Sequence, residues 1–192
     1  MKLGDAIKKR HSVSKFKEKS PDWRDIIECI DSTRYAPMAG EIFTPRFVLI
    51  HDSKKIQEVA TATQQHFVST AKYLVVMCSE NSKTEIHFGS DSEDYIKQQN
   101  GAAIQNFLLS LEEKGLTTTW IKLFVEENVK ETLSIPKELK VVAIFPIGYE
   151  YKKETKEKRL IELDRILYYD KYKNKRMTQP NVAGEDSVRP WF

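Results

Sequence analysis

The apolar run Tyr73–Cys78 (YLVVMC) constrains the fold of this 192-residue chain more than any other segment. A run without polar alternation is typical of a strand that is buried on both faces. Val141–Ile147 (VVAIFPI) predicts a second central strand, and Phe47–His51 and the β-branched segment Thr117–Ile121 predict two more. We therefore expect a sheet with helical layers, in a chain long enough to bury such a core without disulfides or metal ions.

Segments with helical periodicity separate these strands. Ser20, Pro21 and Asp22 predict the start of a helix that runs to about Tyr35, with Ser20 as its N-cap and Pro21 at the first helical position. This helix is expected to bury three isoleucines: Ile26, Ile27 and Ile30. The other predicted helices are Lys2–Lys9, one that Asp52 and Ser53 cap, the longest from Asp91 or Ser92 to Gly115, and Glu126–Leu133. Residues 80–90 are polar and are predicted to form a loop.

The character of the chain changes after Gly148. Residues 152–176 hold ten Lys or Arg and five Asp or Glu, although the net charge of the whole chain is only +3. Such a basic segment is a solvated surface, a nucleic-acid-binding tail or a source of cations for a bound anion, and composition leaves all three open. The aromatic end Trp191–Phe192 favours an arm that packs on another surface. We expect a core over residues 1–150 and, in the same domain, a basic C-terminal helix and arm over residues 151–192.

Several function classes lack support in the sequence. No segment approaches the ~18 consecutive apolar residues of a membrane helix. Met1–Arg10 has no apolar stretch of the signal-peptide kind, so we expect a cytoplasmic protein with no membrane partner. The net charge is too mild to predict nucleic-acid binding. The histidines and cysteines show no metal-ligand spacing, and Cys29 and Cys78 lie in apolar patterns typical of small core residues. Glycine motifs for dinucleotides, for nucleotide phosphates and for α/β-hydrolases are absent from the sequence.

Three segments offer contacts for an anion or a flat ring. Lys9–Ser12 places a guanidinium, an imidazole and a hydroxyl in succession, and a phosphate monoester needs several charge-assisted donors of this kind. Ala36–Gly40 brings small residues after a helix, where they let a ring approach the backbone closely. Trp120–Phe124 follows a strand end, where free backbone N–H groups can face a ligand. Taken singly, the first of these segments is explained better as an ordinary polar loop and the second as a turn that ends a helix.

Taken in order, these segments resemble the nitroreductase family. Lys9–Ser12 with Phe16 is similar to the Arg-Arg/His-Ser opening of the family, and Ala36–Glu41 followed by Arg46–Val48 is similar to its A-P-S-A-G-N…R-F-V segment. Further matches are Ala103–Leu109 with Gly115–Leu116 and Trp120–Ile121, Ile135–Pro136, Ile147–Tyr149, and Lys158–Arg159 with Ile161–Tyr169. The likeness is collinear from residue 2 to about residue 172. No single motif is specific to the family, but the ordered set of motifs is.

The resemblance implies an α+β fold with a mixed central sheet flanked by helices. It implies an intertwined homodimer with an extended C-terminal arm, which would pack Tyr168, Tyr169, Trp191 and Phe192 on the partner. It also implies one FMN per site at the dimer interface. The family bears its chemistry on flavin N5, so no catalytic side chain and no metal are expected.

The resemblance also implies which residues hold the FMN. At the phosphate end these are Arg10 and Ser12 with Ser14, His11 along the ribityl chain, and Arg159 with Lys158 closing the site. Against the flavin ring, usually from the partner subunit, lie Pro37, Met38, Ala39 and Gly40. Gln65 would meet the pyrimidine edge of the ring, and backbone N–H groups near Lys122 and Leu123 would reach its N5/O4 edge.

Four positions depart from the family pattern. Ser14 stands where many members carry a second Arg or Lys, which removes one cation from the phosphate site. Glu41 replaces the usual Asn and should lower the reduction potential of the flavin if its side chain points inward. Leu123 replaces a common Gly and narrows the space beside N5, and Thr44–Pro45 replaces Pro-Trp. We expect these departures to affect which acceptor is reduced more than whether the flavin binds.

The expected function is that of an FMN-dependent oxidoreductase, which moves hydride from NAD(P)H to an oxidised organic acceptor such as a nitro compound or a quinone. Donor and acceptor would visit the flavin in turn, with ping-pong kinetics. One alternative is a non-catalytic flavin-binding redox sensor, and another is a different flavin chemistry on the same scaffold, such as reductive dehalogenation. A nucleic-acid-binding protein that uses residues 152–176 is a further alternative, which predicts steep salt dependence.

Overall fold

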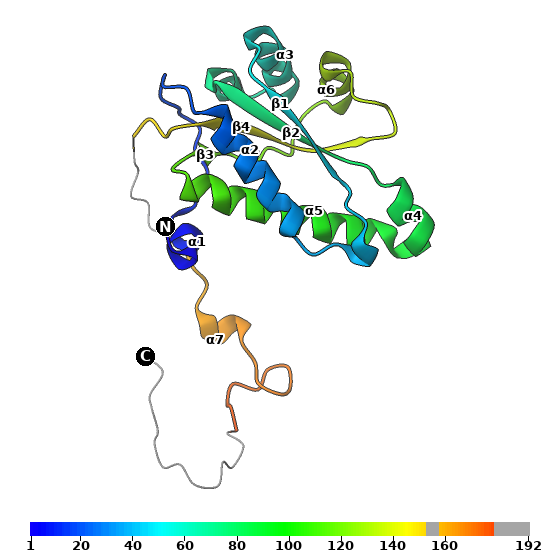
Figure 1. The fold of residues 1–192 in the computed structure, drawn as a ribbon. Coiled ribbons are helices and arrows are strands. Elements are labelled where there is room, and N and C mark those ends of the chain that lie inside the picture. Colours follow the sequence, from blue (N-terminus) through cyan, green and yellow to red (C-terminus); the bar gives the residue numbers. More distant parts are fainter. Residues whose placement is uncertain (153–157, 179–192) are drawn as a thin grey trace. The chain divides into compact units, whose positions relative to one another are not determined.

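One four-stranded sheet forms the centre of the chain in the computed structural model, which describes residues 1–152 and 158–178 (Figure 1). The strand order is β1-β2-β4-β3, and the strands are β1 (Pro45–Ile50), β2 (Tyr73–Ser79), β3 (Thr117–Thr118) and β4 (Lys140–Gly148). All three ladders are antiparallel. The α+β class is confirmed, whereas the prediction of a mixed sheet is wrong for these strands. Parallel pairing in the described ranges is limited to the isolated bridge between Ser12 and Thr118.

Helices supply the rest of the regular structure. The α-helices are α1 (Leu3–Lys9), α2 (Trp23–Asp31), α3 (Ser53–Thr63), α4 (Ser82–Phe88), α5 (Ser92–Glu113), α6 (Glu126–Leu133) and α7 (Leu163–Ile166). Short 3₁₀ turns are η1 (Ser32–Tyr35), η2 (Ala39–Glu41), η3 (His66–Thr70) and η4 (Gly89–Asp91). The chain divides into two units, Met1–Lys153 and Glu154–Phe192, and α7 belongs to the second. The predicted boundary at residue 150 lies close to this division.

The first unit has helices on both faces of its sheet, with α3 and α6 on one face and α2 and α5 on the other (Figure 1). Successive residues of β2 explain this arrangement, because side chains of a strand alternate between the two faces. Leu74, Val76 and Cys78 belong to the core beneath α3 and α6. Val75 and Met77 belong to the core formed with α2 and α5. The prediction of a strand buried on both faces is confirmed.

The helix that begins near Ser20 differs in detail from its prediction. Asp22 is the N-cap, because its carboxylate accepts a hydrogen bond of 2.9 Å from the Arg24 backbone N–H, and Trp23 is the first helical residue. Ser20 and Pro21 therefore lie before the helix, and their predicted places were wrong. Ile26 is fully buried as predicted, but Ile27 lies on the outer side and is 45% exposed.

Residues 80–90 were predicted as a loop, and this prediction was wrong. They contain α4, which ends at Phe88, and the start of η4. Ile86 of this helix is exposed and Thr84 is its buried residue, so the helix has no apolar stripe that a sequence pattern could reveal. The predicted strand Thr117–Ile121 is also shorter than expected, since β3 ends at Thr118 and only an isolated bridge follows at Ile121.

The two cysteines are core residues, as predicted. Cys29, a residue of α2, lies in the core that α2 and α5 form with the sheet, and Cys78 lies in the core on the opposite face. Burial raises the pKa of Cys29 to about 12 and that of Cys78 to about 11, so both thiols stay protonated at neutral pH. Across the described ranges, no three His, Cys, Asp or Glu side chains are grouped as metal ligands. No helix there has the length and apolar character needed to cross a membrane.

Candidate functional site

The segment Arg10–Lys17 lies along the β3 edge of the sheet. The Val13 N–H donates to the Thr118 carbonyl at 3.2 Å, and the Thr119 hydroxyl donates to the Val13 carbonyl at 2.8 Å. Further along, the Lys17 N–H donates to the Tyr149 carbonyl at 2.8 Å. These bonds hold the segment between β3 and the residues that follow β4.

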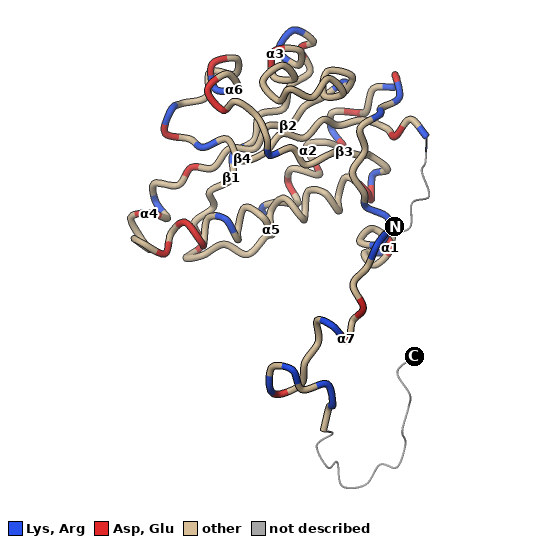
Figure 2. The backbone as a smooth tube through the Cα atoms, turned by 180° about the vertical axis from the view of Figure 1, so that it is seen from behind, with Lys and Arg blue, Asp and Glu red and all other residues tan. Residues whose placement is uncertain are grey.

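Arg10 and Ser12, two of the predicted phosphate-binding residues, lie on this segment with their side-chain polar groups free. The chain leaving α1 is basic, and Arg10 is its helix C-cap (Figure 2). Within residues 1–152 and 158–178, no hydrogen bond or ion pair involves the Arg10 guanidinium or the Ser12 hydroxyl. Ser12 and Ser14 are exposed while Val13 between them is buried, which is the alternation of an extended chain. Unpaired donors of this kind suit a phosphate group.

His11 is paired with a residue that the sequence did not point to. Its Nε2 lies 2.9 Å from a carboxylate oxygen of Glu150, and its Nδ1 lies 2.9 Å from the Lys9 carbonyl oxygen. The hydrogen bond to Glu150 raises the pKa of His11 above its ordinary 6.5, against the opposing effect of burial. No motif links positions 139 residues apart, so this pair could be found only in the folded chain.

The loop after β3 carries the second set of predicted contacts. Lys122 and Leu123 are both exposed, Leu123 to 78%. Their backbone N–H groups have no acceptor in the described part of the chain. The bridge between Ile121 and Ile144 anchors one side of the loop. The Val125 N–H anchors the other side, since it donates to the Ala62 carbonyl at 2.9 Å.

Gln65 lies close to the same end of the sheet. It follows the C-terminus of α3, whose residue Ala62 holds the Val125 loop. Gln65 is half-buried, and its backbone N–H donates to the Thr63 hydroxyl at 3.2 Å. Its side-chain amide has no partner among residues that the structure describes. The Arg10–Lys17 segment, Gln65 and the Lys122–Leu123 loop are thus brought to one region of the first unit.

The Pro37–Gly40 segment lies elsewhere, against α5. The Ala39 N–H donates to the Gln99 amide oxygen at 3.1 Å. Gly40 and Glu41 both adopt left-handed backbone with φ of 58°, and a Cβ on Gly40 would lie 3.2 Å from the Phe88 ring. A cavity of about 310 Å³ opens beside the segment, and its walls are Pro37, Met38, Ala39, Gln98, Gln99 and Ala102.

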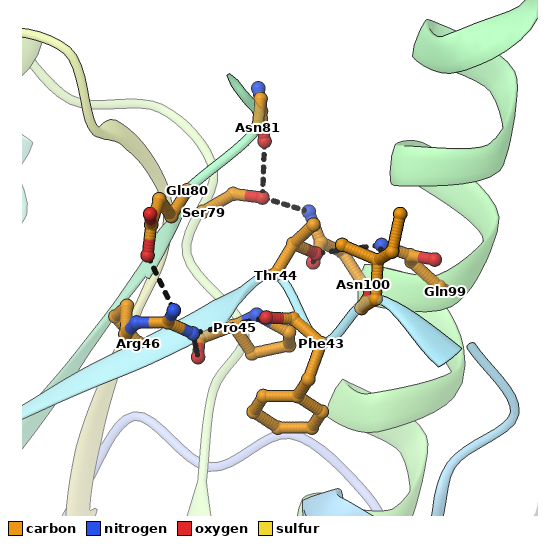
Figure 3. A network of polar contacts seen from close by, with 10 residues as sticks. Phe43, Thr44, Pro45, Arg46, Ser79, Glu80, Asn81, Gln99 and Asn100 are labelled. Carbon is orange, nitrogen blue, oxygen red and sulfur yellow. Dashed lines mark hydrogen bonds and ion pairs between the residues drawn. The ribbon is translucent and has the colours of Figure 1, made fainter. Parts of the chain in front are cut away.

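A buried chain of hydrogen bonds fixes this segment to the sheet (Figure 3). The Gln99 amide donates to the Thr44 hydroxyl at 2.8 Å, which donates to the Asn100 amide oxygen at 3.1 Å. Asn100 in turn donates to the Ser79 hydroxyl at 3.0 Å. Gln99 and Asn100 are each 4% exposed, so every bond lies away from water. Such a satisfied buried network rigidifies the backbone that it joins.

One chain does not bring all the predicted residues together. Gln99 precedes Glu113 at the end of α5 by 14 residues, which is roughly 21 Å along a helix axis. Pro37–Gly40 lies near the α4 end of α5, and β3 follows from its other end (Figure 1). Lys158 and Arg159 belong to the second unit, so their part in the phosphate site stays a prediction. Glu41 is exposed, so its side chain does not point into the protomer.

Comparison with known proteins places this arrangement in a family. The nitroreductase family model matches residues 54–149, half of the chain. An iodotyrosine deiodinase from Thermotoga neapolitana is 25% identical over 163 residues, which are 77% of this chain and 88% of that protein.

Solved structures of similar proteins agree with the family match. A nitroreductase family protein from Clostridium novyi NT is 26% identical, with a TM-score of 0.73 over 91% of this chain and 96% of that one. An NADPH:FMN oxidoreductase from Vibrio harveyi, solved in complex with NAD⁺, shares the fold with a TM-score of 0.76. It is 20% identical, over 90% of this chain and 78% of that one. The family model and the shared fold show that this chain belongs to the nitroreductase family.

Proposed function

We propose that the protein is an FMN-dependent oxidoreductase that moves hydride from NAD(P)H to an oxidised organic acceptor, such as a nitro compound or a quinone, by a ping-pong mechanism. The observation that carries this proposal is the set of unpaired donors in one region: the Arg10 guanidinium, the Ser12 hydroxyl and the N–H groups of Lys122 and Leu123. The Vibrio harveyi enzyme, which has this fold, is an oxidoreductase for NADPH and FMN.

The chemistry of these donors fits the two ends of FMN. The Arg10 guanidinium and the Ser12 hydroxyl can both donate hydrogen bonds to a phosphate. Neither group has a partner among the described residues, so both are available for it. The exposed N–H groups of Lys122 and Leu123 offer neutral donors to the edge of a ring. Bound FMN would supply the hydride chemistry, while the protein holds the cofactor and leaves one face open. His11 and Gln65 would contact the middle and the pyrimidine edge of the cofactor.

A second copy of the chain would complete this site. Pro37–Gly40 lies too far along α5 to reach the donors of its own protomer, so its proposed contact with the flavin ring requires the ring of the partner. Large apolar side chains remain exposed on α1, α2 and η1, namely Leu3 at 68%, Ile27 at 45% and Tyr35 at 80%. Exposed apolar groups of this size favour an interface. We infer a homodimer with shared FMN sites, in which the C-terminal arm also packs on the partner and Arg159 with Lys158 closes each phosphate site.

Reductive dehalogenation is the second candidate. It is favoured by the likeness to the Thermotoga neapolitana iodotyrosine deiodinase, which spans 77% of this chain. Both candidates use the same flavin site and differ only in the acceptor. A non-catalytic flavin sensor would share the site and lack turnover.

The visible absorption spectrum of the purified protein tests the proposal. We expect a flavin spectrum, and release and identification of the chromophore should yield FMN. Oxidation of NADH or NADPH with a nitro compound, a quinone or a halogenated phenol as acceptor then separates the two enzymes from the sensor. A preparation that stays colourless after incubation with FMN would overturn the proposal.

A further inference from the structure

We propose that Glu150 holds the His11 ring as a doubly protonated imidazolium beside Arg10 and Ser12, and that loss of this proton weakens the grip of the site on the FMN phosphate. This inference rests on the proposed function for its ligand, but the pairing itself does not depend on it. Glu150 would act as a positioning residue, because its proposed effect on the cofactor passes through His11.

The geometry of the ring favours two protons. One ring nitrogen faces the Lys9 carbonyl oxygen and the other faces the Glu150 carboxylate, each at 2.9 Å. Both oxygens accept hydrogen bonds and neither can donate one. A neutral imidazole has a single N–H and would leave one of these contacts without a proton, whereas the imidazolium satisfies both.

The backbone on both sides holds the pair in place. Phe16 and Glu150 form an antiparallel bridge, and the Tyr151 N–H donates to the Lys15 carbonyl at 3.0 Å. The side chain of Glu150 is only 12% exposed, so water competes weakly for its carboxylate. The pair therefore joins the phosphate-binding segment to the end of β4 through side chains as well as backbone.

The charges around His11 act in the same direction. Glu150 lies in contact, and Glu112 of α5 acts on the ring from a greater distance. Burial opposes ionisation, but the Glu150 hydrogen bond and these two carboxylates raise the pKa of His11 above 6.5. Arg10 is the neighbouring cation in the chain.

Deprotonation of His11 would change the charge that the phosphate meets. While the imidazolium is present, it adds one positive charge next to Arg10 in the chain. Once it loses its proton, the site loses this charge, and its attraction for a phosphate dianion falls. Ser14 adds no cation at a position where many family members carry one, so the loss of one positive charge is a large change for this site. FMN affinity should therefore fall as pH rises through the His11 titration, by at most about tenfold per pH unit for one proton.

Proton NMR of the histidine ring C–H groups in FMN-free protein tests the pair directly. The His11 signal is identified by its loss in His11→Asn. We expect its midpoint above 6.5 in the wild type and a lower midpoint in Glu150→Gln, which keeps an acceptor oxygen but removes the charge. Glu112→Gln is the matched control and should shift the midpoint much less. An unchanged midpoint in Glu150→Gln would overturn the pairing.

Fluorescence titration with FMN between pH 7 and 9 tests the consequence. Over this range the FMN phosphate is already a dianion, so its own ionisation contributes little. We expect the wild-type dissociation constant to rise as His11 loses its proton, around the midpoint that the NMR titration gives, and that of His11→Asn to stay flat. Riboflavin, which lacks the phosphate, should show no such dependence in the wild type.

Each outcome of the titration has a distinct meaning. Equal pH dependence for FMN and riboflavin, or a wild-type constant that does not change with pH, would overturn the link to the phosphate. Absence of FMN binding at every pH would instead refute the proposed function, and the NMR midpoints would still decide the His11–Glu150 pairing.

Discussion

The ring of Phe16 occupies the space that a side chain at Gly148 would need. A Cβ atom on Gly148 would lie 2.8 Å from Phe16 Cδ1 and 3.1 Å from Phe16 Cβ. Phe16 is buried and its backbone bridges to Glu150, so the ring cannot move aside without moving the segment that carries Arg10 and Ser12. The end of β4 and the proposed phosphate site are therefore packed as one body.

Gly148→Ala should destabilise the protein, because the added methyl group overpacks this contact. We expect a loss of about 1–3 kcal/mol in the free energy of unfolding, measured by urea denaturation, together with weaker FMN retention. Gly4→Ala is the matched control, since a Cβ there meets nothing within 4 Å. It should leave stability unchanged or raise it by up to about 1 kcal/mol. Equal stability of wild type and Gly148→Ala would contradict the packing described.

Removal of the proposed phosphate ligands should give a folded, colourless protein. A charge-assisted hydrogen bond contributes about 1.5–3 kcal/mol, so Arg10→Ala alone should weaken FMN binding roughly 10- to 150-fold. The double variant Arg10→Ala with Arg159→Ala should lose the flavin during purification, with circular dichroism unchanged. Arg34→Ala, which removes an exposed cation paired with Asp31, serves as control. Full flavin occupancy in the double variant would show that the phosphate site is misplaced.

Gln99→Leu should loosen the segment that approaches the flavin ring. The Ala39 N–H would lose its acceptor, at a cost of about 1–3 kcal/mol for an unsatisfied buried group, and the Thr44 hydroxyl would keep only its bond to Asn100. We expect a lower urea midpoint and faster hydrogen exchange at the Ala39 amide. Gln98→Leu changes the exposed neighbour on the same helix and should alter stability by less than about 0.5 kcal/mol. Unaltered exchange at Ala39 would argue against the network as its anchor.

Glu126 should contribute stability that depends on pH. Burial would raise the pKa of Glu126, but hydrogen bonds from the Val141 N–H at 2.9 Å and from Lys130 outweigh it, and its pKa lies below the ordinary 4.5. A depressed pKa stabilises the fold above 4.5, and this contribution is lost as pH falls through the folded-state value. Glu126→Gln should thus be less stable than wild type at pH 7, with the gap closing below pH 4.5. Glu127→Gln, at an exposed neighbouring position, is the matched control for the substitution itself.

A chain that ends at Asp170 tests the role of the C-terminal arm. The two aromatic residues Trp191 and Phe192, which lie outside the described residues, were predicted to pack on the partner subunit. Their removal should weaken the proposed dimer, because large aromatic side chains dominate the energetics of interfaces. Sedimentation velocity over a concentration series measures the change. A dimer as tight as that of the full chain would remove the arm from the interface.

Elements with a local sequence pattern could be predicted before the fold was known. The continuous apolar run of β2 predicted a strand with two buried faces, and the helical spacing of apolar residues in α5 predicted the longest helix. Burial imposes both patterns on the sequence. The start of α2 was harder, since Ser20 and Asp22 are both good N-caps and the hydrogen bond to Arg24 decided between them. The helix α4 could not be predicted from the sequence pattern, because its buried residue is Thr84 and it has no apolar stripe.

The tertiary structure alone decided how the candidate site is assembled. Arg10 and Ser12 could be chosen from the sequence because their chemistry suits a phosphate, but the pairing of His11 with Glu150 spans 139 residues and that of Ala39 with Gln99 spans 60. Both pairings depend on which segments lie side by side, and the antiparallel order of the sheet and the course of α5 set that. Residue type reports the chemistry that a side chain can perform, whereas its partner is a property of the folded backbone.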